Sequence, residues 1–201
     1  MNFQFVLRGC AALAFATLGL IGLAQAAPSN MTITGDAAPP IGHYEFCKQN
    51  PKECAYAGGD AGAIILNQDS WKTILKINYT VNTTIKPMTD MELYGVEEKW
   101  AIPTTAGDCE DFALLKRRML MQSGISASNL LMTVVRKPDG EGHAVLTLRT
   151  KQGDYILDNL EDGIKLWSKT PYSYLKRQTS FNAGRWVTIE NGTDILVGAV
   201  K

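Results

Sequence analysis

A cysteine in the first turn of a predicted helix constrains the fold of this chain more than any other feature. Residues 112–123 have the composition of a helix closed by Gly124, and Cys109 falls in its first turn. Unpaired backbone N–H groups and the positive end of the helix dipole favour a thiolate there, as a nucleophile requires. Three flanking carboxylates oppose the thiolate, so something should neutralise them. The alternative is a capped helix, with Asp108 as N-cap and a core cysteine.

The hydrophobic period changes after Gly124 from that of a helix to that of a strand. Residues 130–136 and 143–150 have a β-type pattern, and turns containing glycine separate them from each other and from 155–159. These connections predict three antiparallel strands, and residues 185–190 predict one more. Residues 167–175 are expected to be irregular or partly helical.

A second, amphipathic helix is predicted before the cysteine. An Asp-Ser pair at 69–70 has the form of a cap, and apolar residues then recur at spacings of three and four until Pro87. This helix should pack on the core. The segment 88–105 is expected to be a loop whose aromatic side chains line the space in front of Cys109, although core packing is the simpler explanation for Trp100 by itself.

The first 26 residues have the form of a secretory signal peptide. Arg8 precedes an uncharged apolar run, and an Ala-x-Ala cleavage site ends at Ala26. The run is short and rich in Ala and Gly, which makes a transmembrane anchor the weaker alternative. We therefore expect an exported chain with an extended N-terminal arm at 27–45 and one domain at 46–201. His43, in the arm, is expected at the surface.

The size and charge of the chain bound its function only loosely. At 201 residues with 45% hydrophobic content, it can bury one good core. Twenty basic and twenty acidic residues cancel. No overall charge therefore indicates a nucleic acid or an anionic membrane as partner.

Export also decides how the cysteines are interpreted. The mature chain would keep Cys47, Cys54 and Cys109, and oxidising compartments pair thiols. Cys47 and Cys54 can close a small loop around Pro51 as a disulfide. Cys109 is then a single thiol, which in an exported protein is either cross-linked between chains or reactive. No nearby C-x2-C or paired histidine completes a zinc site.

Two possible partners of Cys109 follow it in the chain. His143 opens a strand after a glycine-rich turn, and Asp158 ends the next strand, so both can reach one edge of the sheet. Thiol catalysis needs an imidazole to take the proton and a carboxylate or amide to orient it. His143 could instead be a surface hairpin residue. Asp158 could bond its own backbone, with Asn159 as the nearest substitute.

An ordered set of short motifs surrounds these residues. The motifs are Val81-Asn82, Thr89-Asp90, Tyr94-Gly95, Trp100-Ala101-x-Pro103, Gly107-Asp108-Cys109-Glu110-Asp111-Phe112-Ala113, Gly142-His143-Ala144-Val145-Leu146 and Leu157-Asp158-Asn159. Taken together, over residues 44–190, they resemble the bacterial transglutaminase-like cysteine peptidases of the LapG type.

This resemblance implies an α+β fold of the papain-like, transglutaminase-like kind, with the cysteine helix packed on an antiparallel sheet. It also implies a periplasmic endopeptidase with Cys109 as nucleophile, His143 as general base and then acid, and Asp158 as the orienting carboxylate. In the best-known members the substrate is a surface adhesin, cut at a di-alanine so that the cell leaves a biofilm. An inner-membrane receptor for a cyclic dinucleotide sequesters the protease.

Family members also bind calcium through carboxylates around the cysteine, which correspond here to Asp108, Glu110 and Asp111. A physical reason supports this expectation independently. Hard cations take several oxygen ligands, and a divalent ion would offset the negative field that opposes the thiolate.

The expected mechanism is attack of the thiolate on a peptide carbonyl. The backbone N–H of Cys109 would bind the oxyanion, and Trp100 is the candidate for a second donor. A transglutaminase or acyltransferase could use the same three residues, with an amine in place of water. A non-catalytic module that binds a peptide in the cleft is the third alternative.

Overall fold

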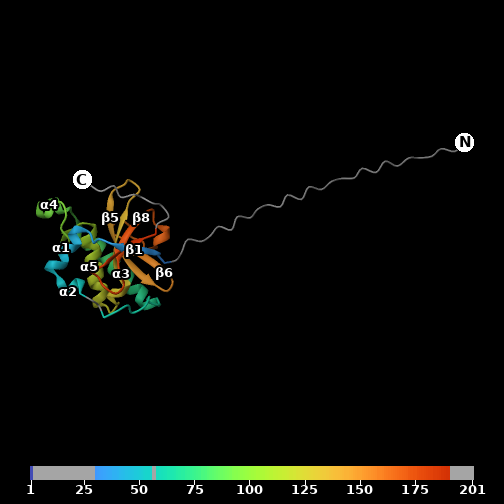
Figure 1. The fold of residues 1–201 in the computed structure, drawn as a ribbon, viewed down its shortest axis with the longest axis horizontal. Helices are drawn as coiled ribbons and strands as arrows, with labels where there is room; N and C mark the ends of the chain where they lie inside the picture. The colour runs from blue at the N-terminus through green and yellow to red at the C-terminus, as the bar shows by residue number, and fades with distance from the viewer. Residues whose placement is uncertain (2–29, 56–57, 191–201) are drawn as a thin grey trace.

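A seven-stranded antiparallel sheet organises the computed structural model, which describes residues 1, 30–55 and 58–190 (Figure 1). The predicted signal peptide lies outside the described residues. The strands lie side by side in the order β1-β9-β8-β4-β5-β6-β7. Their bounds are Ile33–Ala37 (β1), Leu130–Arg136 (β4), Gly142–Thr150 (β5), Gly153–Leu157 (β6), Lys165–Leu166 (β7), Ser173–Gln178 (β8) and Trp186–Ile189 (β9).

The helices α1, α3 and α5 pack on one side of this sheet (Figure 1). A short parallel pair, β2 with β3, links the segments before α4 and α5. No helix in the described part of the chain is both long and apolar enough to cross a membrane. The bounds are Ile41–Gln49 (α1), Pro51–Cys54 (α2), Gln68–Thr84 (α3), Lys86–Pro87 (β2), Asp90–Tyr94 (α4), Ala106–Gly107 (β3), Cys109–Gln122 (α5), and 3₁₀ turns at Ala127–Asn129 (η1) and Trp167–Lys169 (η2).

The predicted amphipathic helix is α3, and its cap lies slightly earlier than expected. Asn67 is the N-cap, and its side chain accepts the backbone N–H of Ser70 while the Ser70 hydroxyl accepts that of Asn67. This reciprocal pairing satisfies two donors that the first turn leaves open. The helix ends at Thr84, before Pro87, as predicted.

The predicted hairpin strands are confirmed, whereas strands β1, β7 and β8 of the same sheet were not predicted. β4 pairs with β5, and β5 pairs with β6, both antiparallel. β8 begins within the last three residues of the segment 167–175, which was expected to be irregular or partly helical, and it pairs with both β4 and β9. Lys176 and Arg177 interrupt its apolar pattern, which is why its alternation is weak in the sequence.

Alternate residues of the strands face two separate hydrophobic clusters, as the period of two requires. On the helical face, Leu130, Met132 and Leu146 pack against apolar side chains of α3 and α5. On the opposite face, Val135 and Val145 belong to a second cluster. Helices on one face of an antiparallel sheet confirm the α+β class, and α5 thereby holds Cys109 at the sheet.

The expected extended arm at 27–45 needs correction. Residues Ile33–Ala37 are indeed extended, but as strand β1 on β9, and the Met31 N–H donates to Asp154 Oδ2 at 2.8 Å. A boundary at residue 45 falls inside α1, which begins at Ile41 after Pro40. His43, expected at the surface, is only 1% exposed because α1 packs its inner face on the core.

Candidate active site

Cys109 is the first residue of α5, with Asp108 at the N-cap position. The Asp108 side chain makes no capping hydrogen bond, so it is not the simple cap that the alternative interpretation requires. The Cys109 thiol is half-buried and donates to Glu110 Oε2 at 3.1 Å, and its sulfur accepts the backbone N–H of Ala144 at 3.4 Å. Burial, followed by the Glu110 charge, raises the pKa of this thiol well above its usual range.

His143 and Asp158 form a direct pair beside the thiol. His143 Nε2 lies 2.9 Å from Asp158 Oδ1, and the two side chains are buried, with 5% and 3% of their residues' surface exposed. His143 lies in β5 and Asp158 directly follows β6, so the hairpin predicted from the sequence brings them together. Because Nε2 faces Asp158, Nδ1 is the ring nitrogen left for another partner.

The three expected residues therefore meet in one region, although their hydrogen bonds do not form a continuous line. Within residues 30–55 and 58–190, the bonds of the Cys109 thiol go to Glu110 and Ala144, and none joins it to the His143 ring. Ala144 is the residue that follows His143 in β5. The thiol thus lies against the backbone that carries the imidazole.

The Asp158 carboxylate is held by several donors. Oδ1 also accepts the backbone N–H of Leu160 at 3.0 Å, and Oδ2 accepts the Tyr172 hydroxyl at 2.5 Å. Burial raises the pKa of Asp158, but the interactions with His143 and the other donors outweigh this effect and lower it. Asp158 is therefore an ionised partner for the imidazole.

Carboxylates also gather next to Cys109. One oxygen each of Asp90, Asp108 and Glu110 lies within 4.8 Å of the others. Asp90, the first residue of α4, was not among the expected ligands, because a Thr-Asp pair before an apolar residue indicates only a helix start. Burial, then the charge of Asp108, raises the pKa of Glu110 to about 9.

Asp111, which the sequence suggested as the third ligand, has one oxygen engaged elsewhere. Its Oδ1 accepts the backbone N–H of Ala101 at 2.7 Å. Its Oδ2 is buried without a hydrogen-bond partner, as are Asp90 Oδ1 and Asp108 Oδ1. Burial raises the pKa of Asp111 to about 7. Buried carboxylate oxygens without donors are the kind of site that a hard cation satisfies.

Trp100 lies in the core rather than in front of the thiol. It is 6% exposed, and its indole N–H donates to Glu98 Oε1 at 2.8 Å. Its ring lies edge-on to His43, with centroids 5.3 Å apart. This indole N–H is already committed, which agrees with the core-packing explanation and not with a free oxyanion donor.

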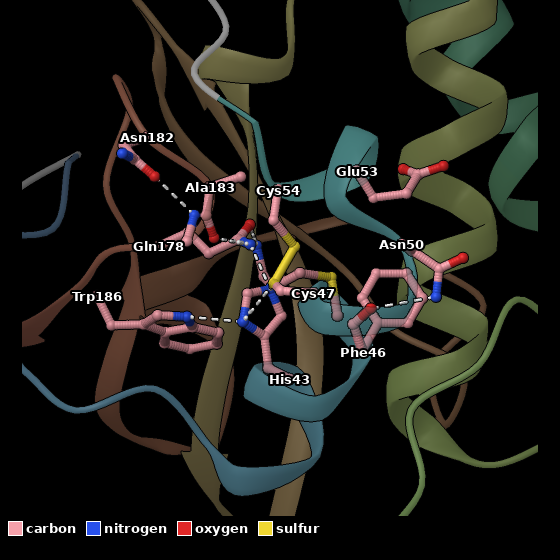
Figure 2. The surroundings of a disulfide bond; sticks show 12 residues. His43, Phe46, Cys47, Asn50, Glu53, Cys54, Gln178, Asn182, Ala183 and Trp186 are labelled. Carbon is pink, nitrogen blue, oxygen red and sulfur yellow. Dashed lines mark hydrogen bonds between the residues drawn. A yellow bond between two sulfur atoms is a disulfide. The ribbon is translucent and has the colours of Figure 1, made fainter.

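A disulfide joins Cys47 to Cys54, with a sulfur–sulfur distance of 2.02 Å, and Cys109 is the free cysteine of the described residues. Figure 2 shows the His43 ring beside this disulfide, between it and Trp186. The Trp186 indole N–H donates to His43 Nδ1 at 3.2 Å, and Gln178 Nε2 lies 2.9 Å from His43 Nε2. His43, the other histidine of the chain, therefore has a structural role and is not the general base.

Comparison with known proteins identifies the family. The structure of Legionella pneumophila LapG described as calcium-bound is 26% identical to this chain, with a TM-score of 0.51 over 64% of this chain and 75% of that one. The same protein after EGTA treatment gives 25% identity and a TM-score of 0.49 over 63% and 74%. No curated protein matches the chain.

The family model for bacterial transglutaminase-like cysteine proteinases matches residues 33–194. This match and the likeness to LapG confirm both the resemblance and the transglutaminase-like fold that the sequence predicted. The model begins at the first residue of β1, which agrees with β1 being part of the folded domain. Since the model spans most of the chain, this protein belongs to the bacterial transglutaminase-like cysteine proteinases.

Proposed function

We propose that this protein is an exported endopeptidase in which Cys109 is the nucleophile, His143 the general base and then acid, and Asp158 the residue that orients His143. The observation that carries the proposal is the Ala144 N–H, 3.4 Å from Cys109 Sγ. It supports the proposal because it places the thiol against the residue that follows His143 in β5. The Nε2 atom of His143 in turn lies 2.9 Å from Asp158 Oδ1.

The proton path follows from which imidazole nitrogen is free. Asp158 engages Nε2, so Nδ1 takes the proton of the Cys109 thiol as sulfur forms a bond to the peptide carbonyl carbon. The backbone N–H of Cys109, at the first position of α5, has no intrahelical acceptor and binds the oxyanion. Nδ1–H then protonates the leaving amine, and the carbon–nitrogen bond breaks. A water molecule that gives its proton to Nδ1 hydrolyses the thioester, and the thiol is restored.

We also propose that Asp90, Asp108 and Glu110 hold a calcium ion, with Asp111 adding negative charge beside them. Their clustered oxygens and the buried oxygens without donors fit a hard cation. The similar LapG structure that is described as calcium-bound supports this choice of ion. When bound, calcium would supply positive charge that offsets the field opposing a thiolate at Cys109.

The substrate is proposed from the resemblance alone: a surface adhesin cut at a di-alanine, in a periplasm to which the signal peptide directs the chain. A receptor for a cyclic dinucleotide in the inner membrane is the proposed regulatory partner.

The test compares cells that carry the active protein with cells that carry Cys109→Ala, by mass spectrometry of new N-termini among exported and surface proteins. Cleavage should disappear in Cys109→Ala, and the purified variant should melt like the wild type. Asp158→Ala should lower kcat by roughly a thousandfold or more, whereas Asn159→Ala, its matched neighbour, should not. Cleavage that persists in Cys109→Ala contradicts the proposal, and amine-coupled products would indicate a transferase instead.

A further inference from the structure

The second oxygen of Asp158 has a partner that the three-residue mechanism does not use. The Tyr172 hydroxyl donates to Asp158 Oδ2 at 2.5 Å, at the short end for a hydroxyl on a carboxylate. Burial, then Asp158, raises the pKa of the Tyr172 phenol above its ordinary value, so the hydroxyl stays a donor. Oδ1 meanwhile faces His143 and the Leu160 N–H. Both oxygens of the carboxylate are therefore fixed.

The Tyr172 ring also contacts the imidazole itself. The rings of Tyr172 and His143 meet edge to face, with centroids 5.6 Å apart and an angle of 62°. Tyr172 lies just before β8 and is half-buried, whereas His143 and Asp158 are almost fully buried. One partly exposed side chain thus touches both members of the buried pair.

Resting on the proposed function above, we propose that Tyr172 is a positioning residue that fixes the His143–Asp158 pair. Its hydroxyl holds the carboxylate so that Oδ1 faces Nε2, and its ring limits rotation of the imidazole. Nδ1 then stays directed to the side of Cys109. Without the hydroxyl, Oδ2 loses its donor and the carboxylate can rotate away from the ring.

Tyr172→Phe tests the hydroxyl, and Tyr174→Phe is the matched control. Tyr174, two residues later in β8, is buried, packs on Trp167 and shares a hydrogen bond with the Thr170 hydroxyl at 2.8 Å rather than with the pair. Tyr172→Phe should lower kcat roughly tenfold with KM unchanged within about twofold, because one hydrogen bond to a charged group is lost. Tyr172→Ala, which also removes the ring, should lower kcat further, and Tyr174→Phe should change neither constant.

An NMR measurement on the full chain labelled with ¹⁵N-histidine reports the positioning without relying on activity. The chain has two histidines, and His143→Asn assigns their signals. Tyr172→Phe should move the Nε2–H resonance of His143 and leave that of His43 in place, and Tyr174→Phe should move neither.

The two readouts separate failure of this inference from failure of the proposed function. If the wild-type protein is active and the His143 resonance is unchanged in Tyr172→Phe, the positioning role is overturned, whether or not kcat falls. The protease function is then unaffected. If the wild-type protein cleaves no substrate but the His143 resonance moves in Tyr172→Phe, the protease function is refuted. The contact of Tyr172 with the His143–Asp158 pair is then still supported.

Discussion

At the scale of single residues, burial and the charges around Cys109 decide whether its sulfur can react. Burial and Glu110 raise the pKa of the thiol, and burial with Asp108 raises that of Glu110 to about 9. A helix N-terminus favours the thiolate by only about 0.3–1 kcal/mol. Burial and the carboxylates together therefore outweigh the helix dipole, and the proposed mechanism requires a cation among the carboxylates.

The proposed calcium site leads to a direct measurement. Asp108→Asn, Glu110→Gln and Asp90→Asn should each weaken calcium binding roughly tenfold or more in calorimetry, because each removes a charged ligand. Asp69→Asn is the control, since Asp69 is exposed in the first turn of α3, outside the cluster. The site is ruled out if wild-type protein binds no calcium up to about millimolar concentration, and equal weakening in the control rules out the assignment.

His43 should make stability fall with acid. Burial, then Arg117, lowers its pKa from 6.5 to about 4, so between these values the unfolded chain binds more protons than the folded one. The contribution of neutral His43 to the free energy of unfolding is fully present above about pH 6.5. It decreases by about 3 kcal/mol as the pH falls to 4. The difference in unfolding free energy between wild type and His43→Gln, from urea titrations, should narrow by this amount between pH 7.5 and 4. A constant difference would show that His43 titrates normally.

At the scale of elements, α1 and the loop before β3 approach closely at a glycine. A Cβ at Gly42 would lie 2.3 Å from Trp100 Cδ1 and 2.7 Å from Glu98 Oε1. The same loop donates the Ala101 N–H to Asp111, so this contact anchors a segment beside the acidic cluster. The helix α1, which the disulfide links to α2, therefore supports the loop before β3.

Gly42→Ala should therefore destabilise the protein by about 1–3 kcal/mol, because overpacking at Trp100 outweighs the better helix propensity of alanine. Gly35→Ala is the matched control: no atom lies within 4 Å of its Cβ position, and alanine should be neutral or slightly stabilising in β1. Thermal melts of both variants measure the effect. Equal melting temperatures of the two variants would contradict the prediction, because α1 and Trp100 could then move apart without loss of stability.

At the scale of the whole molecule, strands from opposite ends of the described chain pair at one edge of the sheet. β1 pairs with β9, and the Met31 backbone N–H donates to the side chain of Asp154 in β6. Met31 and Ile189 belong to the same cluster on the sheet face opposite the helices. The N-terminal strand is therefore structural and not a tether.

A chain that begins at residue 39 should be less stable than one that begins at residue 27. Loss of the buried Met31 side chain costs at least about 2 kcal/mol, and removal of β1 exposes the edge of β9 to pairing with other chains. Chemical denaturation and size-exclusion chromatography measure the two effects. A shorter chain that stays monomeric with the melting temperature of the longer one would contradict this role of β1.

The sequence by itself determined the helix that carries Cys109 in its first turn, the hairpin that carries His143 to Asp158, and the pairing of Cys47 with Cys54. These follow from local rules: the period of apolar residues, glycine turns, caps and short loop closure. Only the tertiary structure decided that Asp90 joins the acidic cluster, that Tyr172 holds Asp158, that His43 is buried and that β8 completes the sheet. Each of those depends on contacts between segments distant in the chain, where packing selects among side chains whose local patterns are unremarkable.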